Sequence, residues 1–483
     1  MFMGKRNSKH TKVLWLVVCL QPLFLSNTWA AWGSSDAAAA GAINPEKIVP
    51  DDGLPNLQGR DPGLLVNTPA PSILTINQAV QRAVQWYPDI GTEAGKLFNA
   101  AKKVDVARAK YYPQISGGMN NGITNSYTDH GYSPSLVLSL SQMLYDFGKT
   151  DSSVREANAA VAGQQATVLL SIDKVAHDTA AALVQVQGFQ ALAAIAQEQL
   201  ESLEQLGKLA NERNNEGASS LSDVVQTDAR IEGARATLTQ YQANLERWRA
   251  TLVTYLGWNN IASVSNEFPA SLAKSCGVAD INDQLVPSVL AARARVNQAA
   301  AQLSGAEAQM TPTISLEPEV THYLNDRYAN SEALDRTQYG VYVRVKMPLY
   351  QGGGLTANRD AAQYNLDAAT SAVRTAQLEV RQQLSAAQSQ SISLQQAMLI
   401  QARQQALSQK TRELYQQQYL DLGSRPFLDV LNAEQEVYQA RFTQQQTESQ
   451  LRTLQLDCLY NTGRTRQQFA LNNQSIQGVE IQP

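Results

Sequence analysis

The sequence predicts a mixed α+β fold made of two tandem structural repeats, and three observations lead to this prediction. An alternating segment led by a proline runs from residue 113 to 148 and returns about 200 residues later, at 312–353. Each copy continues into about 66 residues without proline, which is far longer than an ordinary globular helix. A glycine followed six residues later by an aspartate occurs in both copies, at residues 217–223 and 423–429. One such unit cannot bury its apolar surface alone, so we expect it to assemble.

The first 30 residues predict a secretory signal peptide. Four basic residues precede an apolar run at 13–25, and Ala30 ends a cleavage-site pattern. The run is about 13 residues long whereas a membrane-spanning helix needs about 20, so an uncleaved anchor is the weaker alternative. Cys19 raises the question of a lipoprotein. Because Val18 is bulkier than the small residue usual before a lipidated cysteine, we expect Cys19 to leave with the signal peptide.

Composition excludes several classes of protein. Removal of the signal peptide takes the formal net charge from −4 to about −8, and no basic run remains, so the chain is a poor candidate for nucleic-acid binding. Only Cys276 and Cys458 remain after the signal, too few for a disulfide framework, and the sequence leaves open whether they pair. No later stretch is apolar for 18 consecutive residues, so we expect no transmembrane helix.

The segment after the signal peptide is rich in Ala, Gly, Pro and Asp and has no periodicity, which predicts an extended or disordered leader at 31–72. Thr75 then begins a capping pattern for a short helix, which the Trp86-Tyr87-Pro88 sequence interrupts. A second helix is expected from about residue 89 to residue 110.

Period-two alternation marks four candidate strands. In residues 339–347, apolar side chains at odd positions oppose polar or charged ones such as Arg344. The segment 135–141 places leucines on one face and serines mostly on the other, and weaker partners span 114–125 and 313–325. Strands of about 10 to 14 residues with this pattern fit a membrane barrel with lipid outside and water inside. A soluble, half-buried hairpin is the alternative for any single strand, but four at matched positions in a secreted chain favour the barrel.

Each strand pair, joined by a polar loop at 126–133 or 326–337, leads into a long helix. In the first copy, apolar and small residues at spacings of four and three form a heptad seam between residues 175 and 203. A helix of this length reaches about 100 Å. Alanine, serine and glutamine dominate both copies, which by itself is typical of a soluble coiled coil. Beside a membrane barrel, the same composition suits a wall of helices around water.

Enzyme chemistry finds no support in the sequence. Of the histidines after the signal, His130 and His322 lie in or near the strand pairs and His177 on a long helix, and no two have metal-ligand spacing. The three glycines at 352–354 lack the lysine and hydroxyl residue of a phosphate-binding loop. No serine lies in a nucleophile-elbow pattern. We therefore predict no catalytic site, no cofactor and no metal.

Taken together, these residues resemble the TolC-like outer-membrane factors of Gram-negative bacteria. The resemblance covers about residues 72–464 and rests on the two-fold repeat, the strand-pair ends at 145–148 and 348–353, and the glycine-aspartate pattern at the helix turns. It implies a homotrimer in which four strands per chain form one twelve-stranded transmembrane barrel. The barrel would continue into a long periplasmic α-helical coiled-coil barrel, with an equatorial belt at its middle.

The resemblance also implies a gate at the periplasmic end of the helices. By position, Asp223 matches a gate acid and Arg425 a gate base, and a planar guanidinium suits that role because it can bridge a carboxylate and a carbonyl. Asp429 would belong to a three-fold acidic constriction ring. The chain departs from the family pattern at Asn432, which replaces a second ring acid, and at Tyr419, which falls one residue before the gate tyrosine. Helix capping is the alternative role for both aspartates.

The expected function is export through the outer membrane, from an inner-membrane ABC or proton-driven transporter and a periplasmic adaptor to the exterior. The helix turns, with Gly217, Ser219, Gly423 and Ser424, are the expected docking surfaces for the adaptor. The absence of a lipidation signal slightly favours type I protein secretion over small-molecule efflux. A periplasmic coiled-coil structural or adaptor protein without a pore is the alternative, and it leaves the amphipathic strands unexplained.

The expected divisions of the chain follow from these elements. They are a signal peptide at 1–30; a leader at 31–72; a first repeat at 73–262, with a strand hairpin at 112–147, a long helix at 148–214 and a return helix at 220–257; an equatorial linker at 263–286; a second repeat at 287–463, with a helix at 287–310, a strand hairpin at 312–350, a long helix at 354–420 and a return helix at 426–461; and a C-terminal equatorial segment or tail at 464–483.

Overall fold

The structure is a computed structural model that describes residues 69–481, except 127–128, 133, 262, 278–280 and 325–335. The expected signal peptide and the leader up to residue 68 lie outside the described residues. Of the expected leader, residues 69–72 are described, and the Ser72 carbonyl accepts a hydrogen bond from Ser263 Oγ at 2.8 Å. Leu74 forms a parallel bridge with Val264, which brings the start of the first repeat against the linker that ends it.

Two helices precede the first strand. Helix α3 (Ile76–Trp86) begins at Thr75, whose side chain accepts a hydrogen bond from the Gln78 N–H while the Gln78 side chain bonds back to the cap, which is a full capping box. Helix α4 (Pro88–Arg108) has proline in its first turn, where no backbone donor is needed. A 3-10 turn, η2 (Ala109–Tyr111), leads to the strands.

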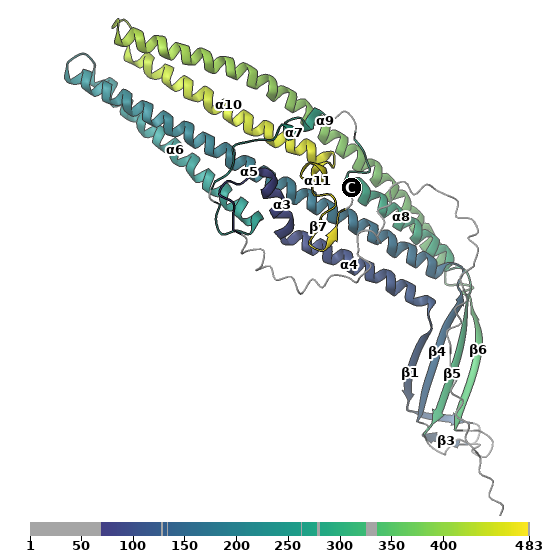
Figure 1. Ribbon diagram of the computed structural model, residues 1–483. Coiled ribbons are helices and arrows are strands. Elements are labelled where there is room, and N and C mark those ends of the chain that lie inside the picture. The colour runs from purple at the N-terminus through teal and green to yellow at the C-terminus, as the bar shows by residue number, and fades with distance from the viewer. Residues whose placement is uncertain are drawn as a thin grey trace, which may run out of the picture. The chain divides into compact units, whose positions relative to one another are not determined.

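Four antiparallel strands from both repeats form one sheet at the end of the helices (Figure 1). They are β1 (Gln114–Asn120), β4 (Ser135–Tyr145), β5 (Thr313–Tyr323) and β6 (Thr337–Lys346), in the order β1-β4-β5-β6. The hydrogen bonds between β4 and β5 therefore join the two repeats edge to edge.

The expected polar loop at 126–133 is wrong in part, because it contains a strand. Strand β2 (Ile123–Ser126) pairs with β3 (Asp129–Tyr132) in a separate two-stranded sheet. The first expected strand, 114–125, is accordingly broken into β1 and β2. Alternation was weak here because Gly117, Gly118 and Gly122 supply no side chains to alternate.

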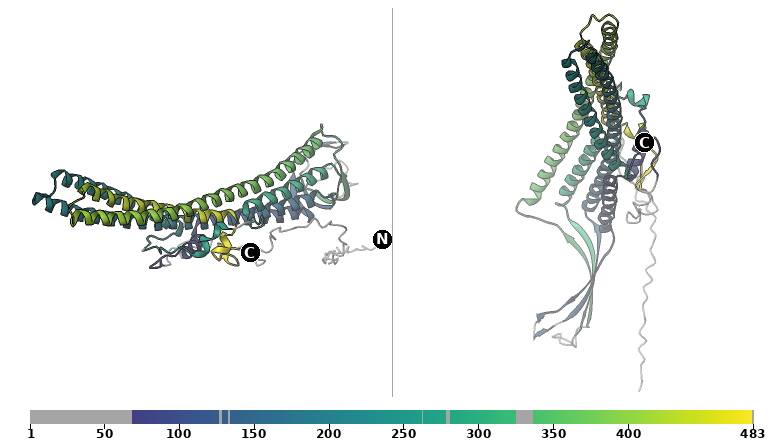
Figure 2. Two further views of the ribbon diagram at one scale, coloured as in Figure 1. Left: turned by 90° about the horizontal axis from the view of Figure 1, so that it is seen from above. Right: turned by 90° about the vertical axis from the view of Figure 1, so that its left-hand side faces the viewer.

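Two helical hairpins of nearly equal size follow the strands. Helix α5 (Lys149–Asn215) pairs with α6 (Leu221–Leu256), and α9 (Gly354–Leu420) pairs with α10 (Phe427–Asn461). The helices α5 and α9 have 67 residues each, or about 100 Å at 1.5 Å per residue. Figures 1 and 2 show the two hairpins running alongside each other, with α8 (Pro287–Ala308) beside the strand-side half of α5.

The expected heptad seam of α5 packs inward. Val175, Thr179, Ala182 and Val186 are all buried, and Leu200 continues the seam toward the tip. By length and composition alone, α5 contains an 18-residue window, with a mean hydropathy of 1.4, that could cross a membrane. Since 56% of that window is buried, it behaves as a core helix packed against its neighbours.

The chain segments between and after the repeats pack around the middle of the helices. The linker holds two short helical turns, α7 (Ala270–Ala273) and η3 (Ser275–Gly277), and the C-terminal segment holds α11 (Thr465–Gln468) and the strand pair β7 (Ser475–Ile476) and β8 (Val479–Glu480). A disulfide between Cys276 and Cys458 fixes the linker to α10, which answers the question that the sequence left open. The C-terminal segment is no free tail, because Phe469 and Leu471 lie in the main apolar core.

Candidate functional site

The register of the four-stranded sheet separates its side chains into one apolar and one polar face. Directly opposed residues in antiparallel strands point to the same side. Ile115 lies opposite Leu140, and Leu316 lies opposite Val343, which puts these side chains on the apolar face. The members of this face, followed across the sheet, are Ile115, Met119, Leu136, Leu138, Leu140, Ile314, Leu316, Val320, Tyr339, Val341, Val343 and Val345.

The opposite face carries hydroxyl groups and charges. The hydroxyls of Ser116 and Ser139 lie 2.7 Å apart, and Arg344 Nε donates to Glu317 Oε2 at 2.5 Å. Glu319 lies opposite Ser139 on the same side. The other face is mainly aliphatic and aromatic, and its polar members are Gln142, His322 and Thr337. A sheet with ions on one side and mainly apolar groups on the other has the pattern expected of strands that lie between water and lipid.

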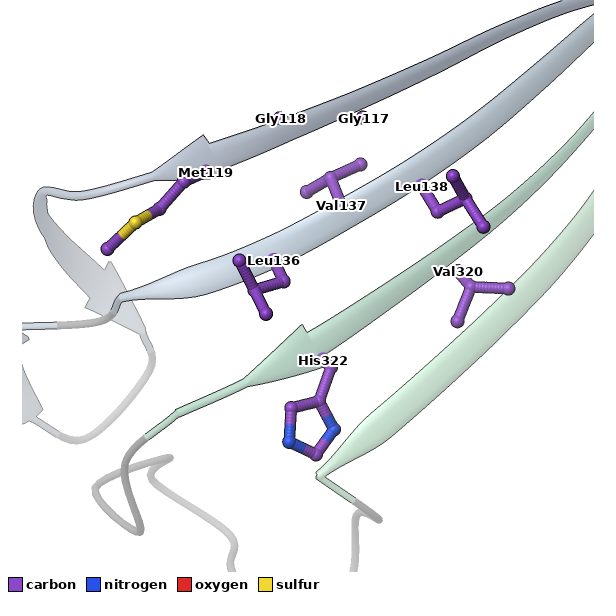
Figure 3. A pocket seen from close by; sticks show the side chains of 8 residues that line it. All are labelled: Gly117, Gly118, Met119, Leu136, Val137, Leu138, Val320 and His322. Atoms are coloured by element: carbon purple, nitrogen blue, oxygen red, sulfur yellow. The ribbon is translucent and has the colours of Figure 1, made fainter.

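The apolar face has no protein cover in the described part of the chain. Val341 and Val343 are 67% and 66% exposed, and Ile115 is 69% exposed. An open hollow of about 480 Å³ lies over this face, where Gly117 leaves a gap beside Leu136 and Leu138 (Figure 3). A continuous exposed apolar face of this kind marks a surface that contacts lipid or another protein.

The first helical tip is held by its own capping interactions. Gly217 adopts a φ of 75° that lets the chain leave α5, and Ser220 caps α6. Asp223 Oδ2 accepts hydrogen bonds from the Ser219 hydroxyl at 2.8 Å and from the Ser220 N–H at 3.2 Å. Burial alone would raise the pKa of Asp223, but these hydrogen bonds outweigh it and lower the pKa. Asp223 thus serves the cap in this chain.

The second tip is organised around Arg425. Its Nη1 lies 3.1 Å from Asp429 Oδ2, and its Nε donates to Gln418 Oε1 at 3.1 Å. The guanidinium carbon also lies 4.1 Å from the centre of the Tyr415 ring. The expected gate base and ring acid therefore bond to each other. The hydrogen bonds and ion pairs found for Arg425 and Asp223 in the described residues do not join these two side chains.

Tyr419 lies between the two tips. Its ring is buried, 5.2 Å from that of Phe427, and the guanidinium carbon of Arg213 lies 4.4 Å from its centre. Arg213 belongs to α5 and Tyr419 to α9, so this contact joins the two hairpins. The Tyr419 hydroxyl is buried without a hydrogen-bond partner in the part of the chain that the structure describes.

Arg230, which sequence reasoning missed, is the hydrogen-bond partner of Asn432. Its Nη2 donates to Asn432 Oδ1 at 2.8 Å, and its Nη1 donates to Gln435 Oε1 at 2.5 Å. Since Arg230 is on α6 and Asn432 on α10, this is a second contact between the hairpins. The only sequence signal that could have pointed to this contact was the replacement of the family's acid by an amide at position 432, and the amide oxygen can still bind a cation.

The hairpins are also joined by a buried carboxylate. Glu434 of α10 is completely buried, and its Oε1 accepts a hydrogen bond from Ser202 Oγ of α5 at 2.5 Å. Arg412 of α9 lies 3.5 Å from the same oxygen. Farther from the tip, Arg441 Nη1 lies 2.6 Å from Glu198 Oε2. A series of polar side-chain contacts between α5 and α10 thus extends along the tip half of the helices.

Nearer the middle, His177 bridges two carboxylates. Its ring nitrogens lie 3.0 Å from Asp178 Oδ1 and 2.8 Å from Asp457 Oδ1. Burial favours the neutral ring, but the two carboxylates outweigh it and raise the pKa of His177 to about 9. The protonated imidazole therefore ties α5 to α10. Among the described residues, no group of three or more His, Cys, Asp or Glu side chains is placed to hold a metal ion.

A two-faced strand sheet joined to helical hairpins several times its length defines a class of outer-membrane channel protein. The family model described as outer membrane efflux protein matches residues 79–258 and 283–457, which are the two repeats. The chain belongs to this family. It is an outer-membrane transport protein of a Gram-negative bacterium, with a channel rather than an enzyme as its functional unit.

Several known proteins are similar to this chain. The outer membrane efflux protein BepC of Brucella suis is 27% identical over 369 residues, which cover 75% of this chain and 79% of BepC. The outer membrane protein TolC of Salmonella enteritidis is 26% identical over 424 residues, which cover 84% and 85% of the two chains.

Solved structures share the fold. The outer membrane protein VceC from Vibrio cholerae aligns with a TM-score of 0.71 and 17% identity, over 80% of this chain and 96% of VceC. The outer-membrane channel OprN aligns with a TM-score of 0.69 and 20% identity, over 87% and 99% of the two chains. The expected resemblance to the TolC-like outer-membrane factors is thus confirmed, and it favours the channel over the coiled-coil protein without a pore.

Proposed function

We propose that three copies of this chain form an export duct that carries substrates from an inner-membrane transporter and a periplasmic adaptor to the exterior. The observation that carries the proposal is the sheet with one uncovered apolar face and one charged face. Such a sheet is stable only when its apolar face contacts lipid and its charged face contacts water, as in the wall of a transmembrane pore.

The edges of the sheet support assembly from several chains, and the resemblance to the family supplies the number three. Four strands are too few to close a barrel, and in the described residues neither β1 nor β6 has a strand partner on its outer side. Unpaired backbone groups are very costly in lipid. Pairing β1 of one copy with β6 of the next supports a closed barrel of twelve strands from three chains.

The long helices would continue this barrel as a periplasmic coiled-coil tunnel. Helix α9 buries few side chains along its 67 residues, while Leu399, Ile400 and Leu407 are more than 60% exposed. A helix with exposed leucine and isoleucine among many glutamines can pack against a neighbouring copy and still present amide groups to water. The linker and the C-terminal segment would form the equatorial belt, and residues 1–30 would direct secretion.

We place the periplasmic gate at the two tips. Asp223, Arg425 and Tyr419 are its proposed members, with Asp429 and Asn432 at the constriction. Because Arg425 pairs with Asp429, the closed ring would carry less negative charge than three free aspartates. The exposed turns with Gly217, Ser219, Gly423 and Ser424 are the proposed docking surface for the adaptor, whose binding would favour the open tip.

Two classes of cargo have a specific observation in their favour. The bulky Val18 before Cys19 speaks against lipidation and slightly favours type I protein secretion. The description of the family, and that of BepC, name efflux. Deletion of the gene in its host separates the two: loss of one secreted protein with unchanged drug sensitivity indicates secretion, and drug sensitivity with an unchanged secretome indicates efflux.

The test of the channel itself is single-channel recording from the purified mature protein in planar bilayers. Small, cation-selective openings from a protein that runs as a trimer in detergent are the expected result. A folded protein that stays soluble without detergent and gives no openings would instead establish the coiled-coil protein without a pore.

A further inference from the structure

The two helical hairpins face each other across a polar cavity in the tip half of the molecule. The cavity has a volume of about 530 Å³ and lies between α5, α6 and α10. Its lining is rich in side-chain amides, including Gln199, Gln240, Gln435, Gln439 and Gln446. Leu203, Ala234 and Phe442 also line the cavity and belong to an apolar cluster that the hairpins share, so polar contacts and apolar packing together set the separation of the helices.

Arg230, which lines the cavity, supplies polar contacts between α6 and α10. Its guanidinium bonds to Asn432 Oδ1 at 2.8 Å, to Gln435 Oε1 at 2.5 Å and to the Leu431 carbonyl at 3.4 Å. All three acceptors are on α10, so one side chain of the first repeat bonds to one helical turn of the second repeat. An apolar cluster that includes Tyr419 and Phe427 joins the same hairpins. The bonds of Ser202 to Glu434 and of Arg441 to Glu198 link α10 to α5, whereas the Arg230 bonds link α10 to α6.

The partners of Arg230 are all neutral. The ion pairs found among the described residues do not include Arg230, although nearby Arg235 pairs with Glu232 and Glu204 within its own hairpin. A guanidinium bonds more strongly to a carboxylate than to an amide, because the charge on the acceptor adds to the hydrogen bond. The Arg230 contacts are therefore specific in geometry and weaker than an ion pair would be at the same place.

We propose that Arg230 is the latch that holds the two hairpins in the closed arrangement, and that Asn432 keeps this latch weak enough to open. The inference rests on the proposed function, because a latch matters only if the tip opens. It assigns Arg230 as a positioning residue outside the expected gate. It also gives Asn432 a role: an acid at this position would turn the contact into an ion pair and hold the tip more firmly shut.

The first test measures hairpin spacing and requires no pore. Spin labels are placed on exposed positions of α6 and α10 by Gln226→Cys and Glu436→Cys, with the native cysteines held in their disulfide. We expect Arg230→Gln to broaden the label-to-label distance distribution toward longer values, and Asn432→Asp to narrow it. The matched control is Arg235→Gln, which removes an arginine from the same helix without touching α10, and it should leave the distribution unchanged.

The second test measures conductance in planar bilayers. Arg230→Gln should raise the single-channel conductance at least twofold. The conductance of Arg230→Lys should lie between those of Arg230→Gln and the unmodified protein. Asn432→Asp should lower the conductance below that of the unmodified protein. In the double variant Arg230→Gln/Asn432→Asp, the effect of the aspartate should disappear because its partner is gone.

The outcomes separate the latch from the channel. If the unmodified protein forms no pores, the proposed function fails, and the latch is then judged on the spin-label distances alone. If Arg230→Gln gives the same distances as Arg235→Gln, or if Asn432→Asp acts equally with and without Arg230, the latch is wrong even when the pores are normal.

Discussion

Arg466 of the C-terminal segment forms a buried ion pair with Asp173 in the middle of α5. The side chains are 7% and 1% exposed, and Arg466 Nη2 also donates to the Leu285 carbonyl at 3.1 Å. One guanidinium thus fastens the C-terminal segment, a long helix and the linker together. Burial raises the pKa of Asp173 to about 7, although Arg466 acts in the opposite direction.

This pKa predicts a loss of stability as the pH rises from about 4 to about 7. Across that range the unfolded chain has already released the proton of Asp173, while the folded chain still binds it, so raising the pH favours unfolding. Unfolding at several pH values in detergent measures the slope. Asp173→Asn should remove this part of the slope, and an unchanged slope in the variant would contradict the assignment.

His177 predicts a second loss of stability at higher pH. Its folded pKa of about 9 lies above the value of 6.5 for a free imidazole, so the stabilisation is complete below about pH 6.5 and is lost as the pH rises through 9. Its size is on the order of 3 kcal/mol, since each pKa unit corresponds to about 1.4 kcal/mol. His177→Gln should unfold more readily at pH 6 but differ little from the unmodified protein at pH 10. The fall in stability between pH 7 and 9 should be absent in this variant.

The disulfide between Cys276 and Cys458 closes a loop with a sequence separation of 182 residues. Loss of so long a cross-link should destabilise the protein by about 2 to 5 kcal/mol, chiefly by freeing the unfolded chain. Thermal unfolding of Cys276→Ser/Cys458→Ser, compared with the unmodified protein with and without reductant, measures this. Reductant should have no effect on the double variant. Equal unfolding temperatures for all samples would mean that the cross-link contributes nothing.

Two glycines with positive φ form a matched pair for substitution. Gly257 (φ 64°) ends α6, where an added Cβ would lie 2.0 Å from the Trp86 ring. Gly217 (φ 75°) has open space around it. Both alanine variants carry the backbone cost of about 1 kcal/mol, but only Gly257→Ala must also displace a packed indole, so it should be the less stable by several kcal/mol. Similar unfolding temperatures would show that Trp86 moves freely.

Arg425→Ser should raise the conductance and the preference for cations together. Removal of the guanidinium loosens the second tip and leaves Asp429 without its countercharge. Reversal potentials in a salt gradient report the selectivity. Asp223→Ala should also loosen the entrance, but because Asp223 caps α6 it should in addition cost about 1 kcal/mol of stability. Unchanged conductance in both variants would exclude these residues from the gate.

Sequence periodicity could predict the elements that are long enough to repeat their pattern of apolar residues many times. The long helices fall within one residue of their expected ends, since a proline-free run of this length bounded by glycine permits little else. The faces of β4 and β6 were also predictable, because alternation requires only that one face be apolar. Strand β3 and the break between β1 and β2 were missed, since segments of four residues are too short to show a period.

The contacts at the tips could not be predicted, because they depend on side-chain choices between helices far apart in sequence. Position alone matched Asp223 to a gate acid and Arg425 to a gate base, but not their partners, which lie in their own tips: Ser220 for Asp223 and Asp429 for Arg425. Arg230 and Asn432 are 202 residues apart, and no local sequence pattern predicts the hydrogen bond between them. The pairing of Cys276 with Cys458 likewise depends on how the linker folds back on α10.

In the described residues, the outer edges of β1 and β6 have no strand partner, and this constrains how the protein reaches its membrane. A single chain that entered lipid would bring two rows of unpaired backbone donors and acceptors with it, and a single chain in water would offer those rows to any other strand. Neither intermediate can persist at appreciable concentration without aggregating. In the proposed barrel of several chains, insertion into the membrane would therefore have to be coupled to the arrival of the neighbouring chains. A cell that makes too few chains should then contain degraded monomers rather than folded, unassembled ones.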